Sequence, residues 1–308
     1  HGLLRRQRQM CIRDSNINGW IIIDKPAGIT STGVVNKIKR AFSAKKVGHA
    51  GTLDPDATGV LPIALGEATK TIPHIMDEIK SYHFCVKFGE ATDTDDAAGE
   101  IINTSNNRPK DDKISALLPK YTGVIEQTPP NYSAIKVNGV RAYDLARSGK
   151  HLKLRARSLF VKELKFLERV DEDHALLQLT CGKGGYVRSI ARDLGKDLKC
   201  FAHVKWLKRI WSGPFELKNS ISLQNFDEVR ELSSLKQLLQ PIEVGLQNLP
   251  FVTCNTKDVG HIANGRSIIV SSTEIEADKT CWVKCDGKAL ALGTVRDSQF
   301  YPSRVLNI

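Results

Sequence analysis

The chain has 308 residues, of which 41% are hydrophobic and 26% are charged, a balance typical of a globular protein with one large domain or two ordinary ones. It contains no run of eighteen apolar residues, which excludes a membrane-spanning helix. The formal net charge is +11, and so basic a chain favours a polyanionic partner, nucleic acid first, because neutralised phosphates release counterions. A basic surface that is merely solvated is the alternative.

Seven cysteines are scattered along the chain, and their number is odd. The closest pair, Cys281 and Cys285, has no second pair or histidine cluster nearby, and no secretory segment is visible. We therefore expect reduced thiols in a cytoplasmic protein, with no structural zinc and no other metal.

The opening stretch, residues 1–16, shows neither helical nor strand periodicity and is rich in arginine. We expect a non-native or disordered leader and leave it out of the fold. A flexible basic arm that contacts RNA is the alternative. Without this stretch the rest of the chain is still basic.

Regular patterns begin directly after the leader. An apolar run at residues 20–23 predicts a short strand, and Thr30 or Ser31 can cap a helix that follows it. A stretch rich in glycine and proline, residues 48–70, predicts turns around a short strand at 60–65.

Alternation of apolar and polar residues is cleanest over residues 81–88, which predicts a strand with Tyr82 on its apolar face. An acidic turn follows at residues 92–100. Further along we expect a helix near 113–118, strands near 159–168 and 175–181, and a helix opened by the glycines of KGGYVRSIARDLGKDL.

A basic segment occupies residues 136–157, with seven lysines or arginines against one aspartate and little continuous apolar pattern. This composition predicts an exposed insertion, about residues 130–157, that faces phosphates. A solvated helix surface is the alternative.

The pattern weakens around residues 240–250, where two prolines occur, and this predicts a linker. Short strands and glycine turns follow. The last sixty or so residues, 248–308, suffice for a small β-barrel with SIIV, TCWVKC, ALALGTV and SRVLNI as strands.

Asp54 is the first candidate for chemistry, because it lies among glycines in GTLDPDATG. Glycine lets the backbone approach a ligand closely, and Pro55 restricts the turn. On shape alone, an aspartate before proline is more often a turn residue.

Six spaced blocks, all in one order, resemble the bacterial family of tRNA pseudouridine-55 synthases, the TruB type. Several blocks in a common order are more specific than any single motif, and these cover most of residues 17–215. The blocks are GWIIIDKPAGITS (19–31), KKVGHAGTLDPDATGVLPIALGEATK (45–70), KSYHFCVKFGEATDTDDAAGE (80–100), PPNYSAIKVNGVRAYDLAR (129–147), CGKGGYVRSIARDLG (181–195) and AHVKWLKRI (202–210).

The resemblance implies a role for each matching residue. Asp54 matches the catalytic aspartate, which attacks the target uridine so that its glycosidic bond breaks and the ribose rejoins at carbon 5. Tyr82 matches the tyrosine that stacks on the flipped base and assists removal of the C5 proton. Arg188 matches the arginine paired with the aspartate, and a guanidinium there keeps an attacking carboxylate ionised. Substrate-binding positions are implied at His49, Asp96, Tyr186, Leu207, Lys25 and Lys70.

Each of these residues has a plainer interpretation when the resemblance is set aside. Tyr82 is in phase with an apolar strand face, as a core aromatic would be. Tyr186 and Arg188 also fit the start of a helix, and His49 and Asp96 fit turns.

The implied fold is mixed α/β (α+β). It has a pseudouridine-synthase catalytic domain over residues 17–240, with a largely antiparallel central sheet, and a small PUA-like RNA-binding barrel over 248–308. An isomerisation needs no redox partner or external donor, and the chain has no Walker loop, dinucleotide fingerprint or zinc spacing, so we expect no cofactor. Six cations of the insertion are expected to contact phosphates of the tRNA T arm: Arg141, Arg147, Lys150, Lys153, Arg155 and Arg157.

These features lead to the hypothesis of a tRNA pseudouridine(55) synthase that extrudes the T-loop uridine, at a cost offset by stacking on an aromatic ring. The alternative is a non-catalytic tRNA-binding protein or RNA chaperone acting on the T arm, which has no physical need for Asp54, Tyr82 and Arg188 together. An RNA-guided relative is disfavoured, because the basic insertion supplies its own substrate grip. We expect a cytoplasmic monomer with tRNA as its partner, no membrane association and no obligatory protein partner.

Overall fold

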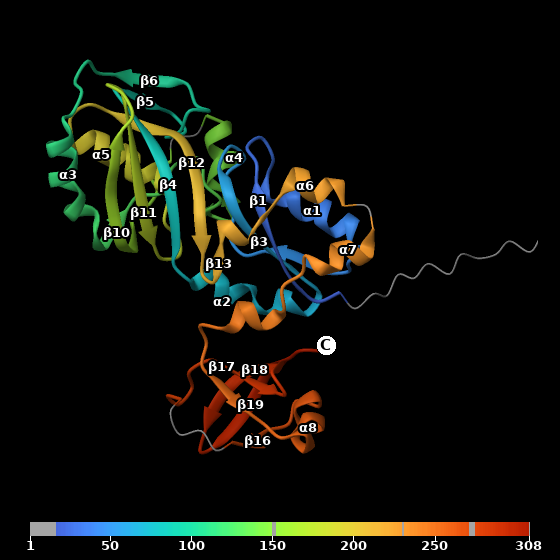
Figure 1. Ribbon diagram of the computed structural model, residues 1–308. Helices are drawn as coiled ribbons and strands as arrows, with labels where there is room; N and C mark the ends of the chain where they lie inside the picture. Colours follow the sequence, from blue (N-terminus) through green and yellow to red (C-terminus); the bar gives the residue numbers. More distant parts are fainter. Residues whose placement is uncertain (1–16, 150–151, 230, 271–274, 308) are drawn as a thin grey trace, which may run out of the picture.

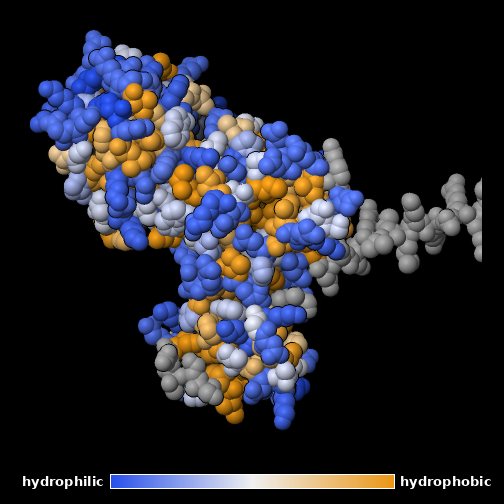
Figure 2. Space-filling model, in the orientation of Figure 1, coloured by the Kyte–Doolittle hydropathy of each residue, from blue (hydrophilic) through white to orange (hydrophobic). Residues whose placement is uncertain are grey.

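The computed structural model describes residues 17–149, 152–229, 231–270 and 275–307, so the expected leader and Lys150 lie outside the described residues. A ten-stranded sheet organises the larger part of the molecule, and a five-stranded sheet forms the smaller C-terminal part (Figure 1). Apolar side chains form separate patches on the face shown in Figure 2, with hydrophilic side chains between them. Within the described ranges, no helix is long and apolar enough to cross a membrane.

The large sheet is mostly antiparallel, as expected. The β1–β14 and β3–β12 pairs are parallel, and the other pairs among its described strands are antiparallel. In spatial order its strands are β14 (Ile221–Ser222), β1 (Gly19–Lys25), β3 (Thr58–Leu65), β12 (Ala202–Ser212), β4 (Lys80–Phe88), β11 (His174–Cys181), β10 (Arg157–Arg169) and β7 (Gly123–Gln127), with β2 (Val47–His49) on β3 and β13 (Phe215–Glu216) on β12.

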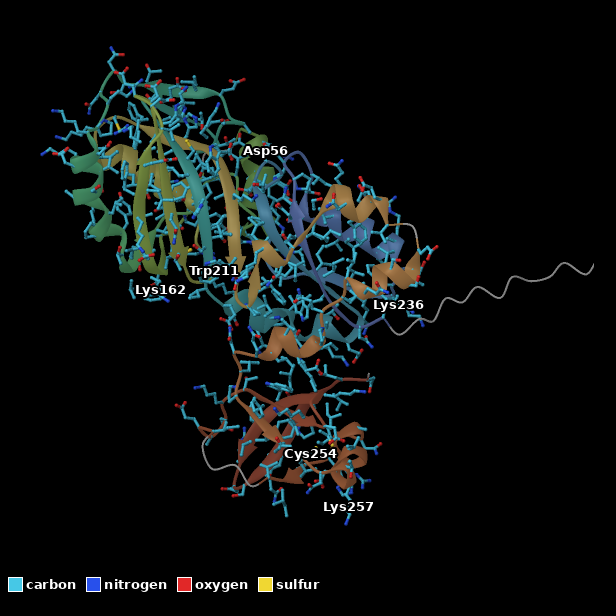
Figure 3. The ribbon with its side chains drawn as sticks, viewed as in Figure 1. Asp56, Lys162, Trp211, Lys236, Cys254 and Lys257 are labelled. Carbon is cyan, nitrogen blue, oxygen red and sulfur yellow. The ribbon has the colours of Figure 1, made fainter. Side chains whose placement is uncertain are left out.

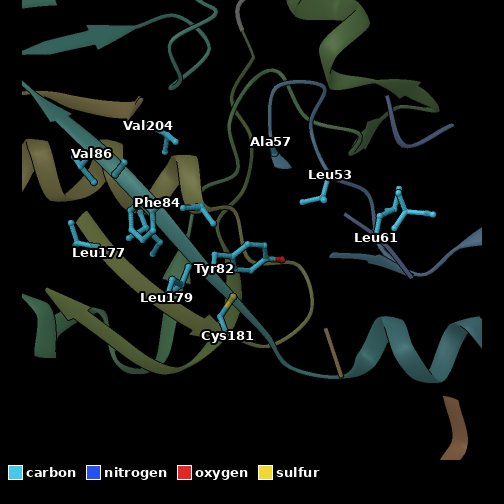
Figure 4. Packing of buried hydrophobic residues seen from close by; sticks show 14 of the residues in the cluster. Leu53, Ala57, Leu61, Tyr82, Phe84, Val86, Leu177, Leu179, Cys181 and Val204 are labelled. Carbon is cyan, nitrogen blue, oxygen red and sulfur yellow. The ribbon is translucent and has the colours of Figure 1, made fainter. Parts of the chain in front are cut away.

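Strand β4, which the alternation predicted, lies in the middle of this sheet. Tyr82, Phe84 and Val86 are buried in the main hydrophobic core. Figure 4 shows them with Leu177 and Leu179 of β11, and the hydroxyl of Tyr82 points toward the side of Leu53. A central strand covered in this way gives the site a rigid floor.

Helices follow the strands where the sequence signals place them. The side chain of Thr30 caps α1 (Ser31–Ala41) by accepting a hydrogen bond from the Gly33 amide at 2.9 Å. The glycine turn before Tyr186 opens α5 (Val187–Asp197). The other helices are α2 (Ile72–Asp77), α3 (Asp111–Leu117), α4 (Ala142–Arg147), α6 (Leu223–Glu228), α7 (Leu232–Gln237) and α8 (Val259–Ala263), and two small ladders pair β5 (Glu90–Thr92) with β6 (Ile101–Thr104) and β8 (Lys136–Val137) with β9 (Val140–Arg141).

The C-terminal sheet contains the four expected strands and one that sequence patterning missed, β15. The sheet is curled, and its edge strands β15 and β16 do not pair with each other. It therefore forms a PUA-like half-barrel that is not closed. In spatial order the strands are β15 (Phe251–Thr253), β17 (Cys281–Cys285), β18 (Lys288–Arg296), β19 (Gln299–Val305) and β16 (Ile268–Ile269).

The segment expected to be a linker, residues 240–250, is instead packed. The backbones of Gln240 and Trp20 exchange two hydrogen bonds, at 2.8 and 2.7 Å. Fully buried Trp20 shares a hydrophobic cluster with Leu246 of this segment and with Trp282 and Leu292 of the small sheet. Apolar burial therefore docks the C-terminal sheet onto the larger part.

Candidate active site

Asp54 lies in the loop between β2 and β3, and the loop is anchored on both sides of it. Leu53 and Ala57 are buried in the core and flank the aspartate. The hydroxyl of Ser31, at the start of α1, accepts a hydrogen bond from the Leu53 amide at 2.9 Å and donates one to the Leu53 carbonyl at 3.0 Å. The Ala57 amide closes the turn on the Asp54 carbonyl at 3.1 Å. The Asp54 side chain, 43% exposed, is thus held at an open surface by a rigid loop. Asp56, labelled in Figure 3, belongs to the same loop.

Arg188 joins this loop to two other segments. Its Nε lies 2.9 Å from Asp54 Oδ2, and its side chain is only 8% exposed. The Nη1 group donates to the Thr94 carbonyl and Nη2 to the Tyr132 carbonyl, both at 3.0 Å. Asp96 Oδ2 lies 3.6 Å from Nη1. With its nitrogens used in this way, the guanidinium meets Asp54 in one fixed orientation.

The charge state of Asp54 results from opposing effects. Desolvation by the surrounding protein raises the pKa of Asp54 above its ordinary value although part of its side chain stays exposed, and the Arg188 guanidinium opposes this rise. The Asp96 carboxylate adds to the rise, and the Lys25 ammonium opposes it. Arg188 therefore favours the ionised form that an attacking aspartate requires.

Tyr82 meets a second buried arginine, to which sequence reasoning assigned no role. Arg209 is 1% exposed and lies opposite Tyr82 in the β12–β4 ladder. Its guanidinium hydrogen bonds the Tyr82 hydroxyl and donates to the carbonyls of Gly51 at 3.0 Å and Val60 at 2.7 Å. Burial raises the pKa of Tyr82, and the Arg209 charge opposes this rise.

Two glycines of the Asp54 block are the sequence feature that could have indicated the close approach of Arg209. Gly59 has φ +98°, and a Cβ there would collide with the Arg209 backbone, where β3 and β12 run side by side. Gly51 has φ +121° and turns its carbonyl to the guanidinium. Side chains at these positions would strain the backbone, so the spacing of the two glycines follows from the approach of β12.

His49 lies at the end of β2. Its Nδ1 atom is buried and has no hydrogen-bond partner within the described part of the chain. Burial lowers the pKa of His49, and the charge of Arg209 lowers it further, so the ring is neutral at neutral pH. The unpaired nitrogen can bond a polar group that enters the site.

Lys25 and Lys70 are both held by hydrogen bonds within the protein. Buried Lys25 donates to the carbonyls of Pro26 and Ile29 at 2.8 Å and of Pro55 at 2.7 Å, and burial lowers its pKa to about 8. It braces the Asp54 loop from beneath. The Lys70 amine bonds Glu67 at 2.5 Å and the Val305 carbonyl at 2.6 Å, at the junction with the C-terminal sheet. Both amines are used internally, because each is surrounded by acceptors of the protein itself.

The remaining pocket candidates lie on the elements around Asp54. Tyr186 occupies the N-cap position of α5. Its backbone amide donates to the side-chain oxygen of Gln127 at 2.9 Å, and its carbonyl accepts from the side-chain nitrogen of Gln127 at 3.1 Å. Leu207 packs against the main core from β12. Asp96 accepts from the Thr94 hydroxyl at 2.6 Å and thereby shapes the turn that contacts Arg188.

The basic insertion is exposed where it is described. Arg141 donates to the Ala134 carbonyl at 2.7 Å, and the Arg147 guanidinium lies 5.6 Å from the centre of the Tyr143 ring. The proposed phosphate-contacting cations that the structure describes are all exposed: Arg141, Arg147, Lys153, Arg155 and Arg157. Within the described ranges, no three His, Cys, Asp or Glu side chains gather to hold a metal ion.

Comparisons with known proteins identify relatives of this chain. Residues 39–187 match the sequence model described as TruB family pseudouridylate synthase (N terminal domain), and residues 188–247 match that of the tRNA pseudouridylate synthase B C-terminal domain. The chain is 51% identical over 292 residues to a tRNA pseudouridine synthase B of Ruegeria sp. (strain TM1040), and the alignment covers 95% of this chain and 97% of the relative. A protein of the same name from Rhodopseudomonas palustris is 42% identical, with 95% and 82% covered.

Solved structures show the same fold at greater distance. A chain in the crystal structure of a Cbf5-Nop10-Gar1 complex has a TM-score of 0.73 and 24% identity, and the match covers 94% of this chain and 85% of that one. The sequence match and the Asp54–Arg188 pair lead to one conclusion. The chain belongs to the TruB family of pseudouridylate synthases.

Proposed function

We propose that the protein is a tRNA pseudouridine(55) synthase, which isomerises the T-loop uridine of tRNA to pseudouridine. The observation that carries this proposal is the half-exposed Asp54 carboxylate, held 2.9 Å from a buried arginine on a rigid loop. The relatives at about half identity over nearly the whole chain carry the matching name, which supports tRNA as the substrate.

The proposed reaction begins with extrusion of the target base into the pocket. Ionised Asp54 attacks C1′ of the flipped nucleotide, and the bond between C1′ and N1 breaks. C5 of the freed base then attacks C1′, and the bond between C1′ and the Asp54 carboxylate breaks. The C5 proton leaves with the assistance of Tyr82, and N1 takes up a proton, so that the product is an isomer of the substrate. Arg188 favours the ionised state of Asp54 and fixes its direction of attack.

Arg209 supports the proposed role of Tyr82. Within the part of the chain that the structure describes, this buried cation has no carboxylate partner and hydrogen bonds the Tyr82 hydroxyl. A positive charge there favours the phenolate form of Tyr82, which is the form that can take up the C5 proton.

We propose that tRNA is gripped mainly by phosphate contacts of the basic insertion, 130–157, and by the PUA-like domain, 248–308, next to a catalytic domain over 17–240. The five proposed phosphate-contacting cations that the structure describes are exposed and can thus reach a polyanion. Asp54, Tyr82 and Arg188 all come from one chain, which supports an enzyme that acts as a monomer without an obligatory protein partner. A tRNA substrate supports a cytoplasmic location.

The decisive experiment maps pseudouridine in a tRNA transcript after incubation with the purified protein. The wild type is expected to convert the T-loop uridine, and Asp54→Asn is expected to abolish conversion while tRNA binding stays nearly unchanged, because the change removes the nucleophile and keeps its volume. Asp56→Asn, on the same loop but with an exposed side chain, is the matched control and should stay active. A wild type that binds the T arm without converting any uridine would establish the chaperone alternative.

A further inference from the structure

Two arginines on α5 each connect the same two segments of the chain. Arg188 and Arg192 are four residues apart and so lie one above the other on the same face of the helix. Arg188 donates to the carbonyls of Thr94 and Tyr132. Arg192 donates from Nη1 to Asp95 Oδ2 at 2.9 Å and from Nη2 to the Thr128 carbonyl at 2.8 Å. We call these two residues with their partners the arginine clamp, because both join the turn at 92–97 to the segment at 128–132.

The Asp95–Arg192 pair is shielded from water. The Asp95 side chain is 13% exposed and that of Arg192 is 15% exposed. Asp193, the next residue on α5, also accepts from Arg192, at 2.9 and 3.2 Å. The guanidinium is therefore held from three directions, and its removal would leave a buried carboxylate without its partner.

Asp95 also has an unusual backbone. Its φ is +61°, a conformation that residues other than glycine adopt when their surroundings hold them there. Its carbonyl accepts from the Val204 amide at 3.1 Å, and the Ala97 amide donates back to the Val204 carbonyl at 3.0 Å. These bonds dock the turn on β12, and Arg192 holds the side chain at its apex.

The residues on either side of Asp95 contact Arg188 directly. The Thr94 carbonyl accepts from its Nη1 group, and Asp96 Oδ2 lies 3.6 Å from the same nitrogen. Arg188 in turn holds Asp54 at 2.9 Å. A shift of the turn would therefore move two of the contacts that orient Arg188. The segment at 128–132 leads straight into the basic insertion, so the clamp also joins the RNA-facing part of the chain to the catalytic carboxylate.

We propose that the Asp95–Arg192 ion pair is a positioning element for the isomerisation: it holds the turn at 92–97 so that Arg188 meets Asp54 in the orientation that the reaction needs. The inference rests on the proposed function and adds two residues that touch neither substrate nor reacting atoms. A purely stabilising pair would affect unfolding alone, whereas a positioning pair affects the chemical step.

The test is single-turnover conversion of a tRNA transcript with enzyme in excess and at saturation. We expect Arg192→Gln and Asp95→Asn to slow the step by about ten- to a hundredfold, because small misplacements of catalytic groups have effects of that size. The dissociation constant for tRNA should change less than about twofold. The double variant should be no slower than the worse single variant, because both changes remove one interaction.

The pH profile gives a second readout that a stabilising role would not move. Arg188 and Lys25 oppose the raised pKa of Asp54, and Asp96 adds to the rise. If Arg188 shifts away from Asp54, the acidic limb of the rate profile moves to higher pH in both single variants. Arg192→Lys keeps the charge but lacks the planar fork, so we expect it to restore part of the rate.

Arg169→Gln is the matched control. Arg169 lies on β10, pairs with Asp111 at 2.8 Å and donates to the Glu172 carbonyl at 3.3 Å, so its removal takes away the same kinds of interaction elsewhere. It should leave the rate and the pH profile unchanged at temperatures below unfolding.

The outcomes separate cleanly. An active wild type together with folded Arg192→Gln or Asp95→Asn variants of unchanged rate and pH profile would overturn the inference. Should Arg192→Gln fail to fold, Arg192→Lys with a wild-type melting temperature and a full wild-type rate would overturn it as well. A wild type that binds tRNA without converting it would refute the proposed function instead.

Discussion

Positive charge is used in opposite ways in two regions of this molecule. Around Asp54, Arg188 and Arg209 are almost fully buried, and their guanidinium groups are held by carbonyls, a carboxylate or a phenol. In the basic insertion, residues such as Arg147 and Arg155 are exposed. A buried cation must find fixed partners, because desolvation is costly. An exposed cation keeps its hydration and attracts a polyanion over a distance.

This difference predicts separate consequences of mutation. Changes at the buried arginines should alter the chemical step, since they move or recharge Asp54 and Tyr82. Changes in the insertion should alter affinity and its dependence on salt, since they remove long-range attraction. Variants in both regions and at the domain junction test that separation.

The largest effect is expected from Arg188→Ala. We expect the single-turnover rate to fall by at least about a hundredfold, because Asp54 loses its orienting partner. Arg188 opposes the raised pKa of Asp54, so its loss raises that pKa further. The rate needs the ionised carboxylate, falls as pH drops through its pKa, and in the variant should begin to fall at higher pH. An acidic limb at the wild-type position would count against the pairing.

Arg209→Met should slow the chemical step by about tenfold or more, since the Tyr82 hydroxyl loses its charged partner. The carbonyls of Gly51 and Val60 also lose their donor, which should lower the free energy of unfolding by about 1–3 kcal/mol. The measurements are single-turnover kinetics and urea unfolding. Lys208→Met is the control, because it removes a cation from the neighbouring residue. Lys208 is partly exposed, and its amine pairs with the Asp24 carboxylate at 3.5 Å. Equal rates for the two variants would remove Arg209 from the site.

Neutralising Arg147, Lys153 and Arg155 together to glutamine should weaken the binding of different tRNAs about equally. It should also flatten the plot of log affinity against log salt, by roughly one unit or slightly less for each phosphate that is no longer neutralised. The rate at saturating tRNA should stay the same. The control neutralises three exposed lysines outside the insertion and the PUA-like domain, Lys113, Lys162 and Lys236, of which Figure 3 labels the last two. If both triple variants bind as the wild type does, the insertion is merely solvated.

The smallest effect is expected from Lys70→Met, which tests where this lysine acts. Burial alone would raise the pKa of Glu67, but the hydrogen bonds from Lys70 and from the Asn307 amide hold it below its ordinary value. Such a carboxylate stabilises the fold above its unfolded-state pKa, and this stabilisation is lost as pH falls through the folded-state pKa. We therefore expect a loss of about 1 kcal/mol or less at neutral pH, disappearing in acid, with unchanged activity. A large rise in the dissociation constant for tRNA would support the substrate-binding role that the resemblance implies for Lys70.

Local patterning was enough for much of the fold. The alternation around Tyr82 predicted β4, the cap at Thr30 predicted α1, and the glycines before Tyr186 predicted the start of α5. These signals are local, because side-chain period and capping depend on residues a few positions apart. The short strand β15 escaped prediction because three residues show no clear period. The packing of the segment at 240–250 was not predicted, because its apolar residues pack against Trp20, which lies far away in the sequence.

For the site, the sequence by itself determined which residues are proposed to carry the chemistry, since the ordered blocks single out Asp54, Tyr82 and Arg188. Only the tertiary structure decided how they are held. In the fold, Arg209 lies against the Tyr82 hydroxyl and the Lys25 amine points inward to a loop carbonyl. Asp95 of one segment pairs with Arg192 of another. Each of these contacts joins residues distant in the chain, and their strength comes from burial, which no local pattern of residue types records.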